Sequence, residues 1–296
     1  MSDAQVLKIW RTIWLGYKFT TKNYGLFLQA ASIYIAFYTF RLFPYGETVP
    51  NALLPAWAYS ILDPLFFAYF AVAWHRFILI DERPTVFHYG VREFKYFALA
   101  WSIYFMASLI FSSPFLFEPG GVFAEMEPKH QSLTQISLIP VAILVAGFCL
   151  IAPFFLPAIS IGYSTKSTWN VWKDFGRNRS RFIALQPLGF GVSLAIFSLA
   201  VVLSAHVLRT PLWFILGKDN EFTWFGDVTI SAIYLTEFIV ALCLAIVSAS
   251  VYAATITSIS IAFGISVGRD PDRIFSESVS NRRPDERPDL AYNDGA

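Results

Sequence analysis

Residues 232–265 read AIYLTEFIVALCLAIVSASVYAATITSISIAFGI, an apolar run in which Glu237 is the only charged residue. A helix needs about 20 apolar residues, each adding about 1.5 Å, to cross the hydrocarbon core of a membrane. The 34 residues of this run would extend roughly 50 Å as one helix, so we expect it to tilt or to project beyond the bilayer. Its small and hydroxyl-bearing residues favour close helix contacts, which predicts a place at the centre of a helical bundle.

The rest of the chain has the same apolar character. Hydrophobic residues make up 56% of the 296 residues and charged residues 15%, and the mean hydropathy is +0.52. These values lie outside the usual range of soluble globular domains. The 30 Phe, 14 Tyr and 9 Trp are enough to supply both lipid-facing surface and the aromatic belts of membrane interfaces. The composition predicts an integral membrane protein.

Six apolar runs are long enough to span a bilayer as helices. They cover residues 24–43, 54–80, 95–117, 136–160, 182–208 and 232–265. A membrane β-barrel would instead show alternating segments of about 10 residues. The predicted fold class is therefore an all-α integral membrane protein with six transmembrane helices.

Lys and Arg are distributed unevenly over the connections between these runs. Eighteen of the 22 lie in the N-terminal segment, the second-to-third and fourth-to-fifth connections and the C-terminal tail. The other four are Arg41, Lys129, Arg209 and Lys218. Because an excess of Lys and Arg marks the cytoplasmic side, we expect both termini in the cytoplasm. No apolar segment with a cleavage site precedes residue 23, so no cleavable signal peptide is expected.

Three segments that precede the first, third and fifth runs are amphipathic. They are residues 6–19, 85–97 and 167–177. As a helix, the last of them places Trp169 and Trp172 on one face and Lys173 and Arg177 on the other, as expected of a helix lying in the membrane interface. The predicted interfacial anchors are Trp10, Trp14, Trp169 and Trp172. The predicted contacts with lipid headgroups are Lys8, Arg11, Lys18, Arg76, Arg92, Lys95, Lys166, Lys173, Arg177 and Arg181.

Each amphipathic segment precedes a pair of apolar runs, which indicates an internal repeat. The three tandem units would cover residues 5–80, 84–160 and 164–265, within one membrane domain of residues 1–268. The tail, residues 269–296, contains few large apolar residues and is expected to be disordered in the cytoplasm.

Asp63 and Glu237 lie inside apolar runs, where an ionisable group is costly and is a functional candidate by default. Two carboxylates in the outer half of the membrane could bind a cation or relay protons, and either could instead lie near headgroups or pair across helices. Arg76 lies close to the cytoplasmic end of the second run, where its long side chain can extend to the headgroups. The four histidines show no metal-ligand spacing, so we predict neither a metal site nor a cofactor.

Sequence motifs of common enzymes are missing. The chain contains no P-loop, GxSxG, HExxH or CxxC motif, which disfavours a conventional enzyme. The basic segments are interleaved with aromatic residues, but each adjoins a membrane helix. Anionic lipid on the cytoplasmic side is therefore the expected partner rather than nucleic acid, and a membrane protein partner or a second copy of the chain stays open.

Residues 153–185 read PFFLPAISIGYSTKSTWNVWKDFGRNRSRFIAL and combine a Pro-containing helix end, a small-residue segment and an amphipathic helix. This pattern resembles bacterial inner-membrane proteins of the YciC-like family and the membrane domain attached to some glycerophosphodiester phosphodiesterases. The matching residues are Pro157, Trp169, Trp172, Arg177, Asn178 and Arg181. The resemblance implies a bacterial inner-membrane location and a helical membrane module, without a soluble phosphodiesterase domain to supply catalysis.

Three functions compete for this chain. The first is a non-enzymatic membrane protein that engages anionic lipid and acts in envelope or membrane organisation or as an accessory subunit. The second is a small transporter that uses Asp63 or Glu237, and the third is an intramembrane lipid-modifying enzyme. A polar cavity that reaches the membrane midplane and is lined by both carboxylates would favour transport, whereas a packed apolar bundle would favour the first function.

Overall fold

The structure is a computed structural model that describes residues 6–42, 56–84, 90–112, 128–176, 178–216, 221–224 and 228–268. Within these residues the chain is helical apart from one short β-hairpin, so the helical fold class is confirmed and the hairpin is an addition to it. The tail 269–296, predicted to be disordered, and the predicted headgroup contact Arg177 lie outside the described residues.

Among the described residues, strand pairing is confined to one short hairpin between helices. The α-helices are α1 (Ile9–Lys22), α2 (Tyr24–Leu42), α3 (Ala56–Ile80), α4 (Val91–Ser112), α5 (Pro128–Ile151), α6 (Phe155–Ser160), α7 (Thr165–Asp174), α8 (Asn178–Leu203), α9 (Thr210–Leu216) and α10 (Ala232–Ser266). A 3-10 turn, η2 (Ala152–Phe154), precedes α6, and a π-helical segment, η3 (Ser204–Arg209), follows α8. The antiparallel hairpin consists of β1 (Glu221–Trp224) and β2 (Val228–Ser231).

Five helical stretches among the described residues are long and apolar enough to cross a membrane. They are Tyr24–Leu42, Ala58–Ile80, Pro140–Ser160, Asn178–Leu212 and Tyr234–Ser266. These stretches occupy the places of the predicted first, second, fourth, fifth and sixth runs. The predicted third run coincides with α4, a helix of 22 residues that is not among the five. The helical lengths and composition are those of a multi-pass membrane protein.

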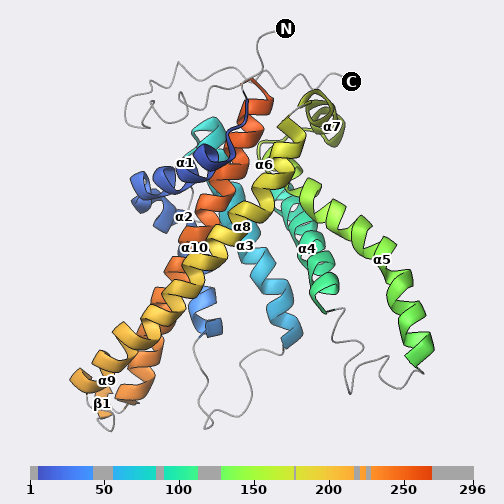
Figure 1. Cartoon of the computed structure of the whole chain (residues 1–296). Helices are drawn as coiled ribbons and strands as arrows, with labels where there is room; N and C mark the ends of the chain where they lie inside the picture. Colours follow the sequence, from blue (N-terminus) through green and yellow to red (C-terminus); the bar gives the residue numbers. More distant parts are fainter. Residues whose placement is uncertain are drawn as a thin grey trace.

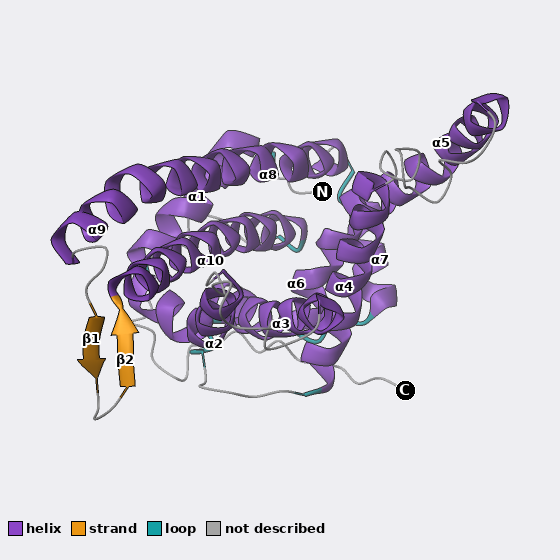
Figure 2. Ribbon diagram, turned by 90° about the horizontal axis from the view of Figure 1, so that it is seen from below, coloured by secondary structure: helices purple, strands orange, loops and turns teal. Residues whose placement is uncertain are grey.

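Helix α10 lies at the centre of the bundle, as its small and hydroxyl-bearing residues predict. It packs against α1, α2, α3 and α8, and Figure 2 shows α1 and α8 on one side of it and α2 and α3 on the other. In Figure 1, α1 and α7 lie at one end of the bundle and the β1–β2 hairpin lies at the opposite end. We call the end that carries α1, α7 and the junction between α3 and α4 the basic end.

Aromatic side chains join α2, α3 and α10 into one core. Phe27 of α2 meets Phe70 and Trp74 of α3 edge to face, with ring centroids 6.1 and 6.0 Å apart. Such aromatic pairs add about 0.5–1.5 kcal/mol beyond the effect of burial. Ala249 and Ala253 of α10 are fully buried beside them, and their small side chains let the helices approach closely.

The three predicted amphipathic segments do not all form separate helices. The first and third form the separate helices α1 and α7. Residues 91–97 of the second segment are the first turns of α4, which continues without a break to Ser112, and residues 85–89 lie outside the described part. The sequence predicted a separate interfacial helix over residues 85–97. For residues 91–97 this prediction is wrong, because they belong to the continuous helix α4.

A proline interrupts the predicted apolar run 136–160 after the end of α5. Helix α5 ends at Ile151, and Pro153 is the second residue of the 3-10 turn before α6, where a proline has no backbone N–H to continue the helical bonding. The short helix α6 packs against both α3 and α4. The break thereby carries Ser160 and Gly162 to the basic end of these two helices.

Candidate functional site

One face of α1 is fitted closely to α10. The buried residues of this face include Thr12, Ile13 and Gly16. A Cβ atom on Gly16 would lie 2.4 Å from the Ser258 hydroxyl oxygen and 2.5 Å from the carbonyl oxygen of Ala254, so a glycine is required for this approach. The Ser258 hydroxyl also lies 3.3 Å from the carbonyl oxygen of Thr12, which it can reach as a donor. The inner face of α1 is therefore committed to protein.

The outer face of α1 carries tryptophan and cations. Trp10 and Trp14 are 64% and 69% exposed, and their spacing of four residues puts both indoles on one face. Arg11 and Lys18 are also exposed and lie on the adjoining face. A helix with this arrangement can place its indoles at the acyl boundary of a membrane and its cations among headgroups. The predicted anchors Trp10 and Trp14 are accessible for that role.

Helix α7 uses its tryptophans differently. Trp172 is 6% exposed and packs against Phe154, with ring centroids 4.9 Å apart, and against Phe182 at 5.9 Å. The prediction that Trp172 is a lipid-facing anchor is wrong, since protein aromatic rings already cover it. Trp169 is 45% exposed, and the Lys173 ammonium lies 6.0 Å from its ring centroid. Trp169 alone is available to lipid on this helix.

The segment before α1 is tied to the start of α8. The backbone N–H of Leu7 donates to the Asn178 side-chain oxygen at 3.0 Å, and the Arg181 guanidinium donates to the carbonyl oxygen of Leu7 at 3.1 Å. Leu7 itself is 1% exposed. Arg181 was predicted to contact headgroups, and its guanidinium instead holds the N-terminal segment, because a buried backbone carbonyl requires a donor.

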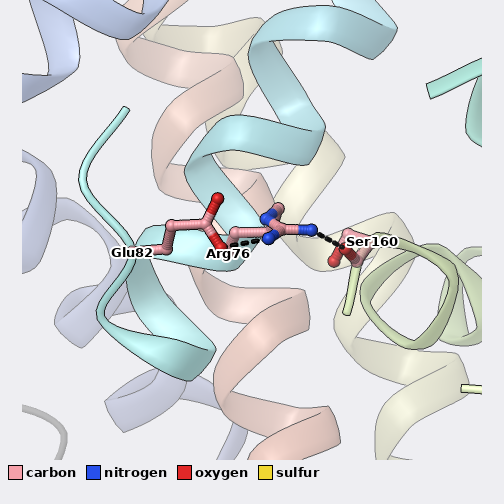
Figure 3. A network of polar contacts seen from close by, with 3 residues as sticks. All are labelled: Arg76, Glu82 and Ser160. Atoms are coloured by element: carbon pink, nitrogen blue, oxygen red, sulfur yellow. Dashed lines mark hydrogen bonds and ion pairs between the residues drawn. The ribbon is translucent and has the colours of Figure 1, made fainter. Parts of the chain in front are cut away.

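The end of α3 is built around Arg76. After Ile80, Asp81 adopts a positive φ of 56°, a left-handed conformation that ends the helix, and the N–H of Glu82 then reaches back to the carbonyl oxygen of Arg76 at 3.4 Å. This turn places Glu82 in an ion pair with the Arg76 guanidinium, which also donates to the carbonyl oxygen of Ser160 at 3.4 Å (Figure 3). Only 18% of the Arg76 side chain is exposed. The predicted headgroup contact at Arg76 is therefore replaced by bonds within the protein.

A fully buried histidine lies one position earlier. His75 Nδ1 lies 2.6 Å from the Ser260 hydroxyl oxygen and Nε2 lies 3.1 Å from the Tyr96 hydroxyl oxygen. The Ser260 hydroxyl also bonds to the carbonyl oxygen of Ile256 at 2.9 Å. A hydroxyl has one proton, so the consistent arrangement has His75 Nδ1–H donating to Ser260 and Tyr96 donating to Nε2. Both ring nitrogens are thus satisfied, and this network joins α3, α4 and α10.

A polar cleft of about 390 Å³ opens between the end of α3 and the start of α4. Its lining includes Arg76, Glu82, Arg83, Arg92 and Glu93. Three of these charged groups are already engaged, because Glu82 pairs with Arg76 and the Glu93 carboxylate accepts the N–H of Gly90 at 2.8 Å as a cap of α4. Within the described part of the chain, Arg83 and Arg92 have no ion-pair partner, and both are exposed. We call this space the arginine cleft.

The two intramembrane carboxylates each have an arginine partner. Asp63 of α3 forms an ion pair with Arg41 at the end of α2, and Glu237 of α10 pairs with Arg209 at 2.5 Å. The structure therefore pairs each acid with a neighbouring helix, the alternative that the sequence left open, rather than showing a joint cation site. Among the described residues, no group of three His, Cys, Asp or Glu side chains could hold a metal ion.

The other predicted headgroup contacts lie on the surface. Seven of the ten have exposed side chains, namely Lys8, Arg11, Lys18, Arg92, Lys95, Lys166 and Lys173. The sequence interpretation missed Arg83, Tyr96 and Ser160 as members of the basic end. The cluster of three arginines within residues 76–92, near the predicted cytoplasmic end of two runs, was the signal that could have located the cleft.

Comparison with known proteins gives no relative for this arrangement. The chain matches no protein-family model, no curated protein and no solved structure. The geometry of the basic end is therefore the feature that points to a function.

Proposed function

We propose that this chain is a non-enzymatic, multi-pass protein of the bacterial inner membrane whose basic end engages anionic lipids. Its role would be in envelope or membrane organisation or as an accessory subunit. The observation that carries the proposal is α1, a helix docked on α10 by one face while Trp10 and Trp14 remain exposed on another. The resemblance to YciC-like proteins at residues 153–185 is part of the same proposal.

The outer surface of α1 combines two groups that bind membranes, indoles and cations. Indoles favour the membrane interface because they combine an apolar body with one polar group. Each Lys or Arg near an anionic surface contributes about 1 kcal/mol, so a row of four gives a substantial preference for anionic over neutral lipid. Lys8, Arg11, Lys18 and Lys22 form such a row along the segment.

The proposed topology has six spans and cytoplasmic termini. Helix α4 would be the one additional span, third in chain order. Its 22 residues extend about 33 Å, close to the thickness of the hydrocarbon core. Consecutive long helices pack as the pairs α2–α3, α4–α5 and α8–α10, which supports three tandem hairpin units. In this topology the basic end faces the cytoplasm, in agreement with the distribution of Lys and Arg.

The transport alternative finds less support. Arg41 and Arg209 compensate the charges of Asp63 and Glu237, and compensated pairs are an ordinary way to bury charge in a helical bundle. If the pairs are structural, Asp63→Asn and Glu237→Gln should leave the cellular phenotype intact. An ion-coupled transporter would lose its function in one of these variants while it is still expressed normally.

Lipid enrichment around the purified chain tests the proposal. The full chain is reconstituted in nanodiscs with equal amounts of phosphatidylcholine and phosphatidylglycerol and then extracted with mild detergent, and the retained lipids are quantified. We expect enrichment of the anionic lipid, and we expect it to fall when Lys8, Arg11, Lys18 and Lys22 are all changed to Gln, because the surface attraction is lost. A Lys129→Gln, Lys218→Gln variant, altered on the opposite side of the predicted topology, serves as the control. Equal retention of both lipids by the unaltered chain would overturn the proposal.

A further inference from the structure

Among the described residues, two arginines that form no ion pair line the arginine cleft. Arg76 contributes to the lining but is engaged by Glu82 and Ser160, which leaves Arg83 and Arg92 to face a ligand. The Arg76 Nε–H is also buried without a hydrogen-bond partner. Guanidinium groups bind phosphate oxygens in pairs of parallel hydrogen bonds. The charged groups of the lining are three arginines and two glutamates, so the cleft has a net charge of +1. It therefore attracts a phosphate monoester, which carries a charge of about −1.5 to −2.

An apolar groove of about 450 Å³ lies on the other side of α6. Its lining comes from four helices and includes Leu99, Phe148, Phe155, Ile159, Tyr163 and Trp169. Most of its exposed lining is apolar, in contrast to the arginine cleft. Trp169, the one indole of α7 that remains exposed, is part of this wall.

The turn at residues 159–163 contacts two arginines of the cleft and forms part of the wall of the groove. On the cleft side, the Ser160 carbonyl oxygen accepts from Arg76, and the Arg92 guanidinium lies 3.6 Å from where a Cβ of Gly162 would stand. On the groove side, Ile159 and Tyr163 form the wall. Gly162 has a φ of +85°, a conformation that a residue with a side chain rarely adopts, so this turn requires glycine at position 162.

Helix α4 gives the two spaces a common edge. Arg92 of the cleft and Leu99 of the groove are seven positions apart, so they lie on the same face and are separated by about 10 Å along the helix. A molecule extended along this face would meet charge at one end and hydrocarbon at the other. An amphiphile with a compact anionic head fits this order of surfaces, whereas a soluble phosphate ester would use only the cleft.

We propose that the basic end binds one lipid with a phosphate monoester headgroup, with the phosphate in the arginine cleft and an acyl chain in the groove beside Leu99. The inference rests on the proposed engagement of anionic lipid and assigns to it a defined site and lipid class. Arg83 and Arg92 hold the phosphate, and the wall at Ile159 and Tyr163 guides the chain. The site is distinct from the outer face of α1, which attracts anionic lipids of any headgroup.

Native mass spectrometry of the full chain in detergent tests this site. Phosphatidic acid and phosphatidylglycerol are titrated separately, and the number of lipids retained per chain is counted. We expect one phosphatidic acid to be retained at concentrations at least tenfold below those needed for phosphatidylglycerol. The Arg83→Gln, Arg92→Gln variant should lose this preference, whereas Arg11→Gln, Lys18→Gln, with the same change of charge on α1, should weaken the binding of both lipids alike and keep the tenfold preference for phosphatidic acid.

A second pair of variants examines the groove. Leu99→Trp should weaken phosphatidic acid binding at least fivefold because the indole fills the space for the chain, and Ala98→Trp on the neighbouring, exposed face should not. Circular dichroism and gel filtration establish that all variants fold. Glycerol 3-phosphate at millimolar concentration should not displace the lipid. If it does, the site takes free phosphate esters and the lipid assignment is overturned.

The outcomes separate this inference from the broader proposal. Enrichment of anionic lipid in nanodiscs together with unchanged phosphatidic acid binding in Arg83→Gln, Arg92→Gln would overturn the site and keep the proposed function. Loss of all anionic preference in the unaltered chain would overturn both. Loss of the preference for phosphatidic acid in the α1 variant as well would show that surface charge alone selects the lipid, which also overturns the site.

Discussion

Helices α1 and α7 have similar sequence patterns but bury different residues. Both have two tryptophans on one face and cations on another, and both lie at the basic end. On α1 both indoles are exposed, and the helix docks through Gly16 and Thr12. On α7 the helix docks through Trp172 itself, and only Trp169 is exposed. Amphipathicity thus identifies a helix with one apolar surface, but it does not say whether lipid or protein covers that surface.

The difference follows from what each helix meets. Helix α1 lies against α10, which presents small and hydroxyl residues such as Ala254 and Ser258, so a small face on α1 permits backbone contact. Helix α7 follows the break at Pro153, which turns Phe154 toward it. A large aromatic face then packs into other aromatic rings. The partner surface therefore decides which side of an amphipathic helix is buried.

The largest expected effect concerns Trp172. Trp172→Ala should lower the free energy of unfolding by about 3–5 kcal/mol, because it opens a cavity among closely packed aromatic rings. Trp169→Ala on the same helix is the matched control and should cost less than about 1 kcal/mol, since the side chain is 45% exposed. Denaturation in mixed micelles with increasing dodecyl sulfate, followed by circular dichroism, measures both. Equal effects would mean that α7 lies on lipid like α1.

The next effect concerns the contact between α1 and α10. Gly16→Ala should cost about 1–3 kcal/mol, because the new methyl group would overlap the backbone carbonyl of Ala254 and the helix must move away. Gly25→Ala in α2 is the control, since nothing lies within 4 Å of its added methyl group, and a helical Ala is favoured over Gly by roughly 0.5–1 kcal/mol. The same denaturation series compares them. A stable Gly16→Ala variant would show that α1 is not docked on α10.

The smallest expected effect on stability concerns the exposed indoles of α1. Replacing both Trp10 and Trp14 by Phe should change the unfolding free energy by about 0.5 kcal/mol or less, as is usual for surface positions. The same change should remove a clear part of the fluorescence quenching by lipids brominated near the headgroup, since these indoles would lie in the interface. Trp172→Phe should lower the total emission but leave the intensity lost on quenching unchanged, because this indole is buried in protein. Quenching that is insensitive to Trp10 and Trp14 would place α1 away from lipid.

Much of the helical layout could be predicted from the apolar runs. The predicted sixth run, 232–265, differs from α10 (Ala232–Ser266) by one residue, because a continuous apolar stretch of this length permits no other regular structure. The fate of residues 85–97 could not be predicted in this way. Amphipathic periodicity is the same whether a short helix lies in the interface or forms the first turns of a longer one, and only the tertiary structure distinguishes the two.

The partners of charged groups were harder to predict from the sequence than the helices were. Arg41 and Arg209 were counted as exceptions to the charge asymmetry, and Asp63 and Glu237 as isolated acids, although each arginine forms a pair with one of the acids. Two isolated cations and two isolated anions on the same predicted side could have predicted these ion pairs, because pairing lowers the free-energy cost of burying all four charges. The arginine cleft depends on the left-handed turn at Asp81, for which the sequence has no glycine as a marker.

The docking of α1 on α10 sets an order of assembly during synthesis. Ser258 and Thr12, which are in contact, lie 246 positions apart in the chain. At about 5–20 residues per second, the ribosome needs roughly 10–50 s to make the intervening residues. During this interval α1 has no α10 to cover its glycine face, and the lipid interface is the surface that can hold an amphipathic helix with two outward indoles in the meantime. The tryptophans of α1 would then first anchor the helix to the membrane, before α10 packs against its glycine face.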